Sequence, residues 1–188
     1  MDHSTTNQEQ TLPRTKKLIL AALMAALTCV GTMIIKVPTP TNGYIHPGDG
    51  FVLLSGLLLG PLWGALAAGI GSALSDLIGG YFIYVPATFV IKALTALVAV
   101  VVYRGLRKAF EHKSVLIALI GSGIAGEAIM VIGYFLFEIF MLAAMNQSSL
   151  TAGVIASLAG ILPNIIQGVF GVVIATILHP LLTRLIQA

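Results

Sequence analysis

Charged residues are scarce in this sequence. Of its 188 residues, 9% are Asp, Glu, Lys or Arg and 57% are hydrophobic, whereas soluble domains carry roughly 25% charged residues. This shortage excludes an ordinary soluble domain and predicts an integral membrane protein. The apolar stretches are continuous and do not alternate with polar residues, so they predict helices and not a spanning barrel. At about 20 residues per crossing plus loops, the chain has room for roughly six helices.

Cysteines and catalytic motifs are scarce as well. Cys29 is the single cysteine, which excludes an internal disulfide and a cysteine-based metal site. The chain contains no G-x-x-x-x-G-K-[ST], H-E-x-x-H or G-x-S-x-G motif. We therefore expect neither a metal nor a cofactor in this chain, and we predict that it is not an enzyme. An intramembrane protease is disfavoured for the same reason.

What the sequence does contain is a series of long apolar stretches. Residues 1–17 predict a polar cytoplasmic tail, and residues 18–188 predict one all-α membrane domain of six transmembrane helices. The predicted spans cover residues 18–35, 49–59, 62–78, 85–103, 114–144 and 154–178. Between the first two lies "KVPTPTNGYIHPG", residues 36–48, a loop rich in proline and glycine.

The cations indicate how the chain is oriented in the membrane. Six spans would put both termini on one side, together with eight cations: Arg14, Lys16, Lys17, Arg104, Arg107, Lys108, Lys113 and Arg184. The opposite side would hold only Lys36. The positive-inside rule then predicts cytoplasmic termini and an external 36–48 loop.

Polar residues inside the apolar stretches are the candidates for function, because each costs a few kcal/mol in hydrocarbon. They are Asp49, Asp76, Lys92, Glu127, Glu138, Asn164 and Gln167. Helical spacing puts them on shared faces: Thr88 with Lys92 and Thr95, Glu127 with Tyr134 and Glu138, and Gly160 with Asn164, Gln167 and Gly171. Most of these groups lie in the outer half or near the middle of the membrane, and the three stripes together predict a small-molecule pocket that opens to the outside.

A structural role is the alternative for most of these residues. Asp49, Asp76 and Lys92 would then pair with one another, and Asn164 and Gln167 would join helices through hydrogen bonds. Glu127, the acid predicted to lie deepest in the membrane, would be a neutral, buried hydrogen-bonding group.

The 36–48 loop is predicted to be a lid over the pocket. Tyr44 and His46 alternate with Ile45, so in an extended loop both face one side. We expect Tyr44 to contact the ligand ring and His46 or Asp49 to supply a polar contact. Asp49 also suits the start of a helix as an N-terminal anion. The alternative is that the loop is only a connector.

Small residues recur at intervals of four in the first span, as Ala21 with Ala25 and Ala22 with Ala26. Such spacing lets helices approach closely. It fits packing within the bundle or an external partner, and we favour the partner.

Several motifs resemble the substrate-binding S component of an energy-coupling factor (ECF) vitamin transporter, in its pyridoxine/hydroxymethylpyrimidine branch. They are G-D at residues 48–49, "LLGP" at 58–61, S-A-x-x-D-L-x-G-G-Y at 72–81, P-A-T-F-x-x-K at 86–92, "GYFLFE" and "PNIIQGVFG". The similarity extends over about residues 18–178. Gly50 departs from the branch, which usually has alanine or a small aliphatic residue after G-D, and this glycine is expected to loosen the start of the second span.

The resemblance implies a multi-pass protein of a prokaryotic cell membrane that binds a vitamin. It also implies two kinds of partner, a membrane T subunit and two cytoplasmic ATPases that use ATP. The family's docking face for the T subunit carries over to Ala21, Ala22, Ala25 and Ala26. The substrate-binding residues predicted from the stripes and the loop are Tyr44, His46, Asp49, Lys92, Tyr134, Glu138, Asn164 and Gln167. The alternative function is a stand-alone secondary transporter or channel.

Overall fold

The computed structural model describes residues 13–110 and 114–187. Two predictions therefore lie partly outside the described residues: the polar tail, up to residue 12, and the cytoplasmic position of Lys113. The elements in chain order are α1 (Arg14–Ile34), β1 (Val37–Pro38), β2 (Tyr44–Ile45), α2 (Asp49–Leu59), α3 (Pro61–Gly79), α4 (Val85–Ala109), α5 (Val115–Met145) and α6 (Leu150–Gln187). The described chain is thus almost entirely helical.

Three helices are longer than the predicted spans. Helix α1 begins at Arg14 and not after a tail that ends at residue 17, and α4 continues past residue 103 to Ala109. Both extensions consist largely of Lys, Arg and apolar residues, which favour helix. Helix α6 begins at Leu150, directly after Ser149, whose Oγ accepts a hydrogen bond from the Ala152 N–H at 3.2 Å. This serine cap sets the end of the turn that precedes α6.

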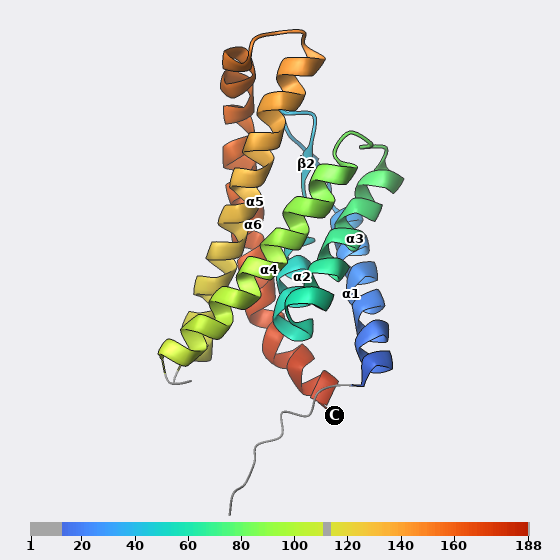
Figure 1. Ribbon diagram of the computed structural model, residues 1–188, viewed down its shortest axis with the longest axis vertical. Helices are drawn as coiled ribbons and strands as arrows, with labels where there is room; N and C mark the ends of the chain where they lie inside the picture. The colour runs from blue at the N-terminus through green and yellow to red at the C-terminus, as the bar shows by residue number, and fades with distance from the viewer. Residues whose placement is uncertain (1–12, 111–113, 188) are drawn as a thin grey trace, which may run out of the picture.

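Five of the helices form a curved wall around the sixth (Figure 1). Along this wall α1 packs on α3, α3 on α4, α4 on α5 and α5 on α6, while α2 contacts α1, α3, α4 and α6. Helix α2 has 11 residues, about 16 Å at 1.5 Å per residue, against a hydrocarbon core of about 30 Å. Five helices of the described chain are long and apolar enough to cross a membrane. The expectation of six full spans is therefore corrected for α2, which does not reach across on its own.

Helix α2 is apolar on all sides because other helices surround it. Val52, Leu53 and Leu54 are consecutive, and none of them is exposed. A Cβ atom at Gly50 would overlap the side chain of Ile174 on α6. Gly50 is thus a point of close helix contact, and the expectation that it loosens this end of α2 is not supported by its surroundings.

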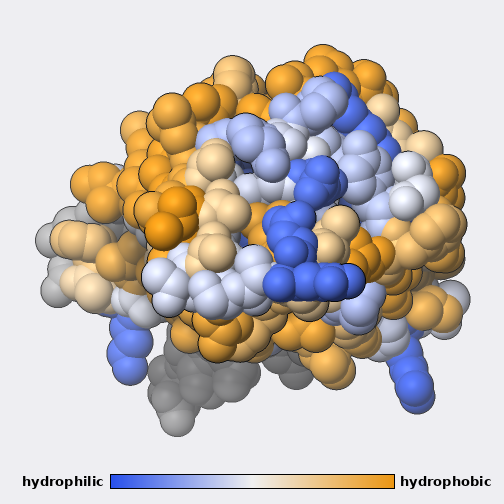
Figure 2. Space-filling model, turned by 90° about the horizontal axis from the view of Figure 1, so that it is seen from above, coloured by the Kyte–Doolittle hydropathy of each residue, from blue (hydrophilic) through white to orange (hydrophobic). Residues whose placement is uncertain are grey.

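The two described ends of the chain lie at the same end of the molecule (Figure 1), where the Lys16 ammonium donates to the carbonyl of Ile186 at 3.0 Å. The opposite end carries the loop between α1 and α2. Seen from that side, hydrophilic residues occupy the middle and hydrophobic residues surround them (Figure 2). This arrangement suits a protein whose rim faces lipid and whose centre admits a polar molecule.

Candidate functional site

A small pocket lies beneath the loop between α1 and α2, inside the bundle. Its walls are Thr32, Thr39, Gly43, Tyr44, His46, Ser72, Ser75, Asp76, Tyr81, Tyr84, Thr88, Tyr134, Glu138, Asn164 and Gln167. The cavity measures about 30 Å³, which is room for one or two water molecules. A ring-shaped molecule would therefore fit only if the walls moved outward.

The lid, residues 36–48, folds as a short hairpin over this pocket. β1 and β2 pair antiparallel, with Val37 opposite Ile45 and Pro38 opposite Tyr44. At the tip, Asn42 has φ 63°, a left-handed conformation that asparagine tolerates better than most residues. Tyr44 and His46 line the pocket, as the alternation in sequence predicts, with ring centroids 5.4 Å apart.

Polar contacts hold the middle of the lid to two helices. The Tyr44 hydroxyl donates to the Asp76 carboxylate of α3 at 2.7 Å, and the backbone N–H of His46 donates to Oε1 of Gln167 on α6 at 3.0 Å. Burial and the nearby Asp76 charge raise the pKa of the Tyr44 hydroxyl, so it stays a donor at neutral pH. These bonds explain why the lid rests in one closed position.

His46 is neutral in this position. Burial lowers the pKa of its imidazole well below the usual range. The Gly48 N–H donates to His46 Nδ1 at 3.1 Å, so the other ring nitrogen, Nε2, carries the proton. His46 therefore offers a donor to a molecule in the pocket without bringing a charge.

The lid tip is joined to α5 by a cluster of three residues. The Thr41 hydroxyl donates to Glu138 Oε1 at 2.8 Å, and the Tyr84 hydroxyl donates to the Thr41 carbonyl at 2.7 Å. The second carboxylate oxygen of Glu138, Oε2, is buried and has no hydrogen-bond partner among the described residues. A ligand with a hydroxyl or amine would find an acceptor here.

Asp49 and Lys92 do not line the pocket. They form a fully buried ion pair between α2 and α4, with Lys92 Nζ 2.5 Å from Asp49 Oδ1. The Gln167 amide donates to Asp49 Oδ2 at 2.7 Å, so both carboxylate oxygens are occupied. Of the two interpretations drawn from the sequence, the geometry matches pairing for Asp49 and Lys92. Asp76 does not join them, since its partner is Tyr44.

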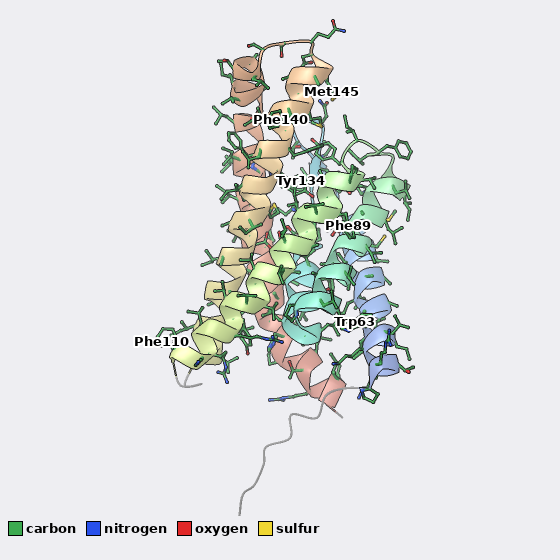
Figure 3. All side chains as sticks on the ribbon, in the orientation of Figure 1. Trp63, Phe89, Phe110, Tyr134, Phe140 and Met145 are labelled. Atoms are coloured by element: carbon green, nitrogen blue, oxygen red, sulfur yellow. The ribbon has the colours of Figure 1, made fainter. Side chains whose placement is uncertain are left out.

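The predicted stripe on α5 divides between two environments. Tyr134 and Glu138 line the pocket, and Tyr134 shares a 3.1 Å hydrogen bond with Thr88; Figure 3 labels its ring on α5. Glu127 lies deeper and outside the pocket walls, and neither of its oxygens has a hydrogen-bond partner among the described residues. Of the predicted stripe on α6, Asn164 and Gln167 both line the pocket.

Several pocket residues were missed in the sequence. Ser72, Ser75, Tyr81 and Tyr84 come from α3 and from the segment that leads into α4. The first two look like small packing residues, and the tyrosines fall in a predicted turn. One feature of the sequence could have indicated all four: they lie close in the chain to Asp76, an intramembrane acid that needs polar partners nearby.

The four alanines of the proposed docking face point in two directions. Ala22 and Ala26 are exposed, while Ala21 is buried and Ala25 is half-buried. A Cβ atom at Gly71 of α3 would overlap the Ala25 carbonyl, so this side of α1 lies directly against α3. Packing within the bundle thus covers Ala21 and part of Ala25, and the docking face stays a prediction whose exposed members are Ala22 and Ala26.

Among the described residues, no group of three or more His, Cys, Asp and Glu side chains is placed to hold a metal ion. The site instead offers hydroxyls, amides, carboxylates and tyrosine rings. Such a set binds a polar aromatic molecule by hydrogen bonds and ring contacts.

Comparisons with known proteins agree with this architecture. A solved structure described as "Structure and mechanism of the S component of a bacterial ECF transporter" matches with a TM-score of 0.66 and 22% identity, over 94% of this chain and 100% of that one. A protein of Pyrococcus woesei, described as "Uncharacterized protein in gap 3'region", is 35% identical over 106 residues. That alignment covers 56% of this chain and 66% of the relative, just under two thirds of its length.

The family model "ECF-type riboflavin transporter, S component" matches residues 13–184, which include all six helices except the last turn of α6. The similarity to the solved structure concerns the same fold. This chain therefore belongs to the family of ECF-type riboflavin transporter S components.

Proposed function

We propose that this chain captures a compact heteroaromatic vitamin or precursor, of the pyridoxine or hydroxymethylpyrimidine type, from outside the cell and delivers it inward. The observation that carries the proposal is the polar pocket closed by the lid. Its hydroxyl, carboxylate and amide groups suit hydroxymethyl substituents, and Tyr44 and Tyr134 suit a flat ring. Its small closed volume favours a single ring, because a larger ligand requires more outward movement of the walls.

Riboflavin is the second candidate, and the description of the matching family favours it. Its three fused rings need a much larger opening of the same pocket. Equilibrium titration of the purified chain with pyridoxine, hydroxymethylpyrimidine and riboflavin separates the candidates. We expect the tightest binding for one of the two single-ring compounds. Tightest binding of riboflavin, or its recovery by mass spectrometry from the purified protein, would show that riboflavin and not a single-ring compound is the substrate.

ECF S components work with a T subunit and ATPases. We infer that this chain works with one T subunit and two ATPases, with both its termini in the cytoplasm. The Lys and Arg residues near the two chain ends support this orientation. Vitamin uptake into liposomes by this chain alone, without ATPases, would instead indicate a stand-alone secondary transporter.

The exposed alanines of α1, Ala22 and Ala26, are the proposed contact with the T subunit. A bulky residue there obstructs close helix contact without entering the pocket. We expect Ala26→Trp to abolish uptake and co-purification of the T subunit, while vitamin binding by the isolated chain stays normal. Leu23→Trp, a change at an exposed position beside this stripe, is the control. Loss of binding in Ala26→Trp together with an intact complex would reject this face.

A further inference from the structure

A second cavity lies beside the lid tip, at the end of the molecule opposite the described termini. It measures about 330 Å³ and is lined by Asn42, Gly80, Tyr81, Phe82, Ile83, Tyr84, Met141 and Met145. Its walls are aromatic and thioether groups from the α3–α4 connection and the end of α5, where Figure 3 labels Met145. We call this space the outer cavity.

The outer cavity and the pocket share a wall. Tyr81 and Tyr84 line both of them. The Tyr84 side chain is 5% exposed, and its ring lies edge-on to Phe137 with centroids 5.3 Å apart. Its hydroxyl is bonded to the Thr41 carbonyl of the lid and lies 3.4 Å from Glu138 Oε1. Tyr84 thus fills the space between the two cavities and is fastened to the lid.

We propose that the outer cavity is a first binding site for the heteroaromatic substrate, and that Tyr84 is the partition through which the substrate passes to the pocket. This inference rests on the proposed function. The walls suit the ligand class, because methionine sulfur and tyrosine faces both attract flat aromatic rings. Because Tyr81 and Tyr84 line both spaces, we assign the same molecule to the outer cavity and to the pocket.

The position of Tyr84 leads to a kinetic expectation. Its bond to Thr41 exists in the empty, closed protein, so losing that bond makes the partition easier to open in both directions. Tyr84→Phe should raise the association and dissociation rates together by about fivefold, the effect of one net hydrogen bond. A residue that binds the ligand would instead raise the dissociation rate alone.

Stopped-flow binding of pyridoxine, hydroxymethylpyrimidine and riboflavin measures these rates. Tyr103→Phe makes the same chemical change on α4 outside both cavities and should leave both rates unchanged. Met145→Trp narrows the outer cavity and should lower both rates. Phe140→Trp introduces the same residue at a 62% exposed position that lines neither cavity, and it should leave both rates unchanged. Unchanged rates in both Tyr84→Phe and Met145→Trp would overturn the inference. The outer cavity would then be a surface that lipid, and not substrate, occupies.

A thiol-labelling experiment tests whether Tyr84 limits access to the pocket, independently of which vitamin the protein binds. Ser75→Cys in a Cys29→Ser background puts the only thiol on the pocket wall, and a benzyl methanethiosulfonate added outside must pass Tyr84 to reach it. Labelling should be faster in Tyr84→Phe and slower in Met145→Trp. Equal labelling rates in all variants would reject the partition even if a vitamin binds. If none of the three vitamins binds but labelling follows the expected order, the proposed substrate fails and the partition stands.

Discussion

Two carboxylates in this bundle show opposite ways of placing an acid inside a membrane protein. Asp49 uses both oxygens on protein partners, Lys92 and Gln167, and lies in a fully buried layer below the pocket. Glu138 lies at the pocket wall, where Thr41 occupies one oxygen and the other has no partner among the described residues. Both oxygens of Asp49 already accept hydrogen bonds from the protein, whereas one oxygen of Glu138 accepts none from the described residues. An unpartnered oxygen at the pocket wall therefore distinguishes Glu138 from Asp49 as a candidate binding acid.

Breaking the buried pair should have the largest effect. Lys92→Met leaves the Asp49 carboxylate buried without its countercharge, which typically costs about 3–5 kcal/mol of folding stability. We expect a large fall in the thermal midpoint in detergent and little folded protein. The double variant Asp49→Asn/Lys92→Met removes both charges and should recover much of the loss. Equal instability of the single and double variants would show that the charge pair is not the source of the effect.

Glu138→Gln should have the next largest effect, and it should fall on ligand binding. The amide keeps the shape of the side chain but weakens its acceptance of hydrogen bonds from Thr41 and the vitamin. A buried hydrogen-bond loss of about 1–3 kcal/mol corresponds to roughly 5- to 150-fold weaker affinity. Isothermal titration and thermal unfolding together test the comparison, because the thermal midpoint should change less than in Lys92→Met. A normal affinity combined with lost stability would make Glu138 a structural acid like Asp49.

Tyr44→Phe should have a smaller effect, confined to the lid. The change removes one hydrogen bond to Asp76, worth about 1 kcal/mol, and keeps the ring. Because this bond is present in the protein without ligand, its loss should ease opening of the lid in both directions, so we expect the vitamin association and dissociation rates both to rise by about fivefold. An unchanged dissociation rate would favour the interpretation of the loop as a connector.

The smallest effect expected is a pH dependence of stability that arises from His46. Its pKa is lower in the folded protein than the ordinary value of about 6.5. The unfolded chain therefore binds more protons below that pH, and stability is full above it and falls as the pH decreases. Between pH 7.5 and 6.0 this contribution is roughly 0.8 kcal/mol. His46→Gln should reduce the change in thermal midpoint between pH 7.5 and 6.0. An unchanged pH dependence in this variant would show that His46 is not its source.

The comparison of the two acids also shows how far the sequence could be interpreted. Apolar stretches predicted the six helices, because burial in lipid leaves a strong signal along the chain. The same scarcity of polar residues pointed to Asp49 and Glu138 together, since each is costly in hydrocarbon. The sequence could not separate them, because their partners Lys92, Gln167 and Thr41 are 43, 118 and 97 residues away. Pairing over such separations depends on how the helices pack.

The alanine spacing on α1 illustrates a second limit. A four-residue repeat indicates that something approaches the helix closely, but it applies equally to a neighbour in the bundle and to another subunit. Ala25 faces Gly71 of α3, whereas Ala26, one residue later, is exposed. One turn of helix thus carries one position that is packed within the bundle and one that is exposed. Only the position of α3 distinguishes them.

The short central helix has a consequence for how the protein is made. As α2 leaves the ribosome it is 11 residues long and begins with Asp49, so by itself it is a poor substrate for insertion into the bilayer. Its countercharge, Lys92, is synthesised later on α4, and Gln167 later still on α6. We therefore expect α2 to insert stably only after α4 and α6 have been synthesised. Premature release of truncated chains that end before residue 92 should consequently yield products that quality-control proteases remove.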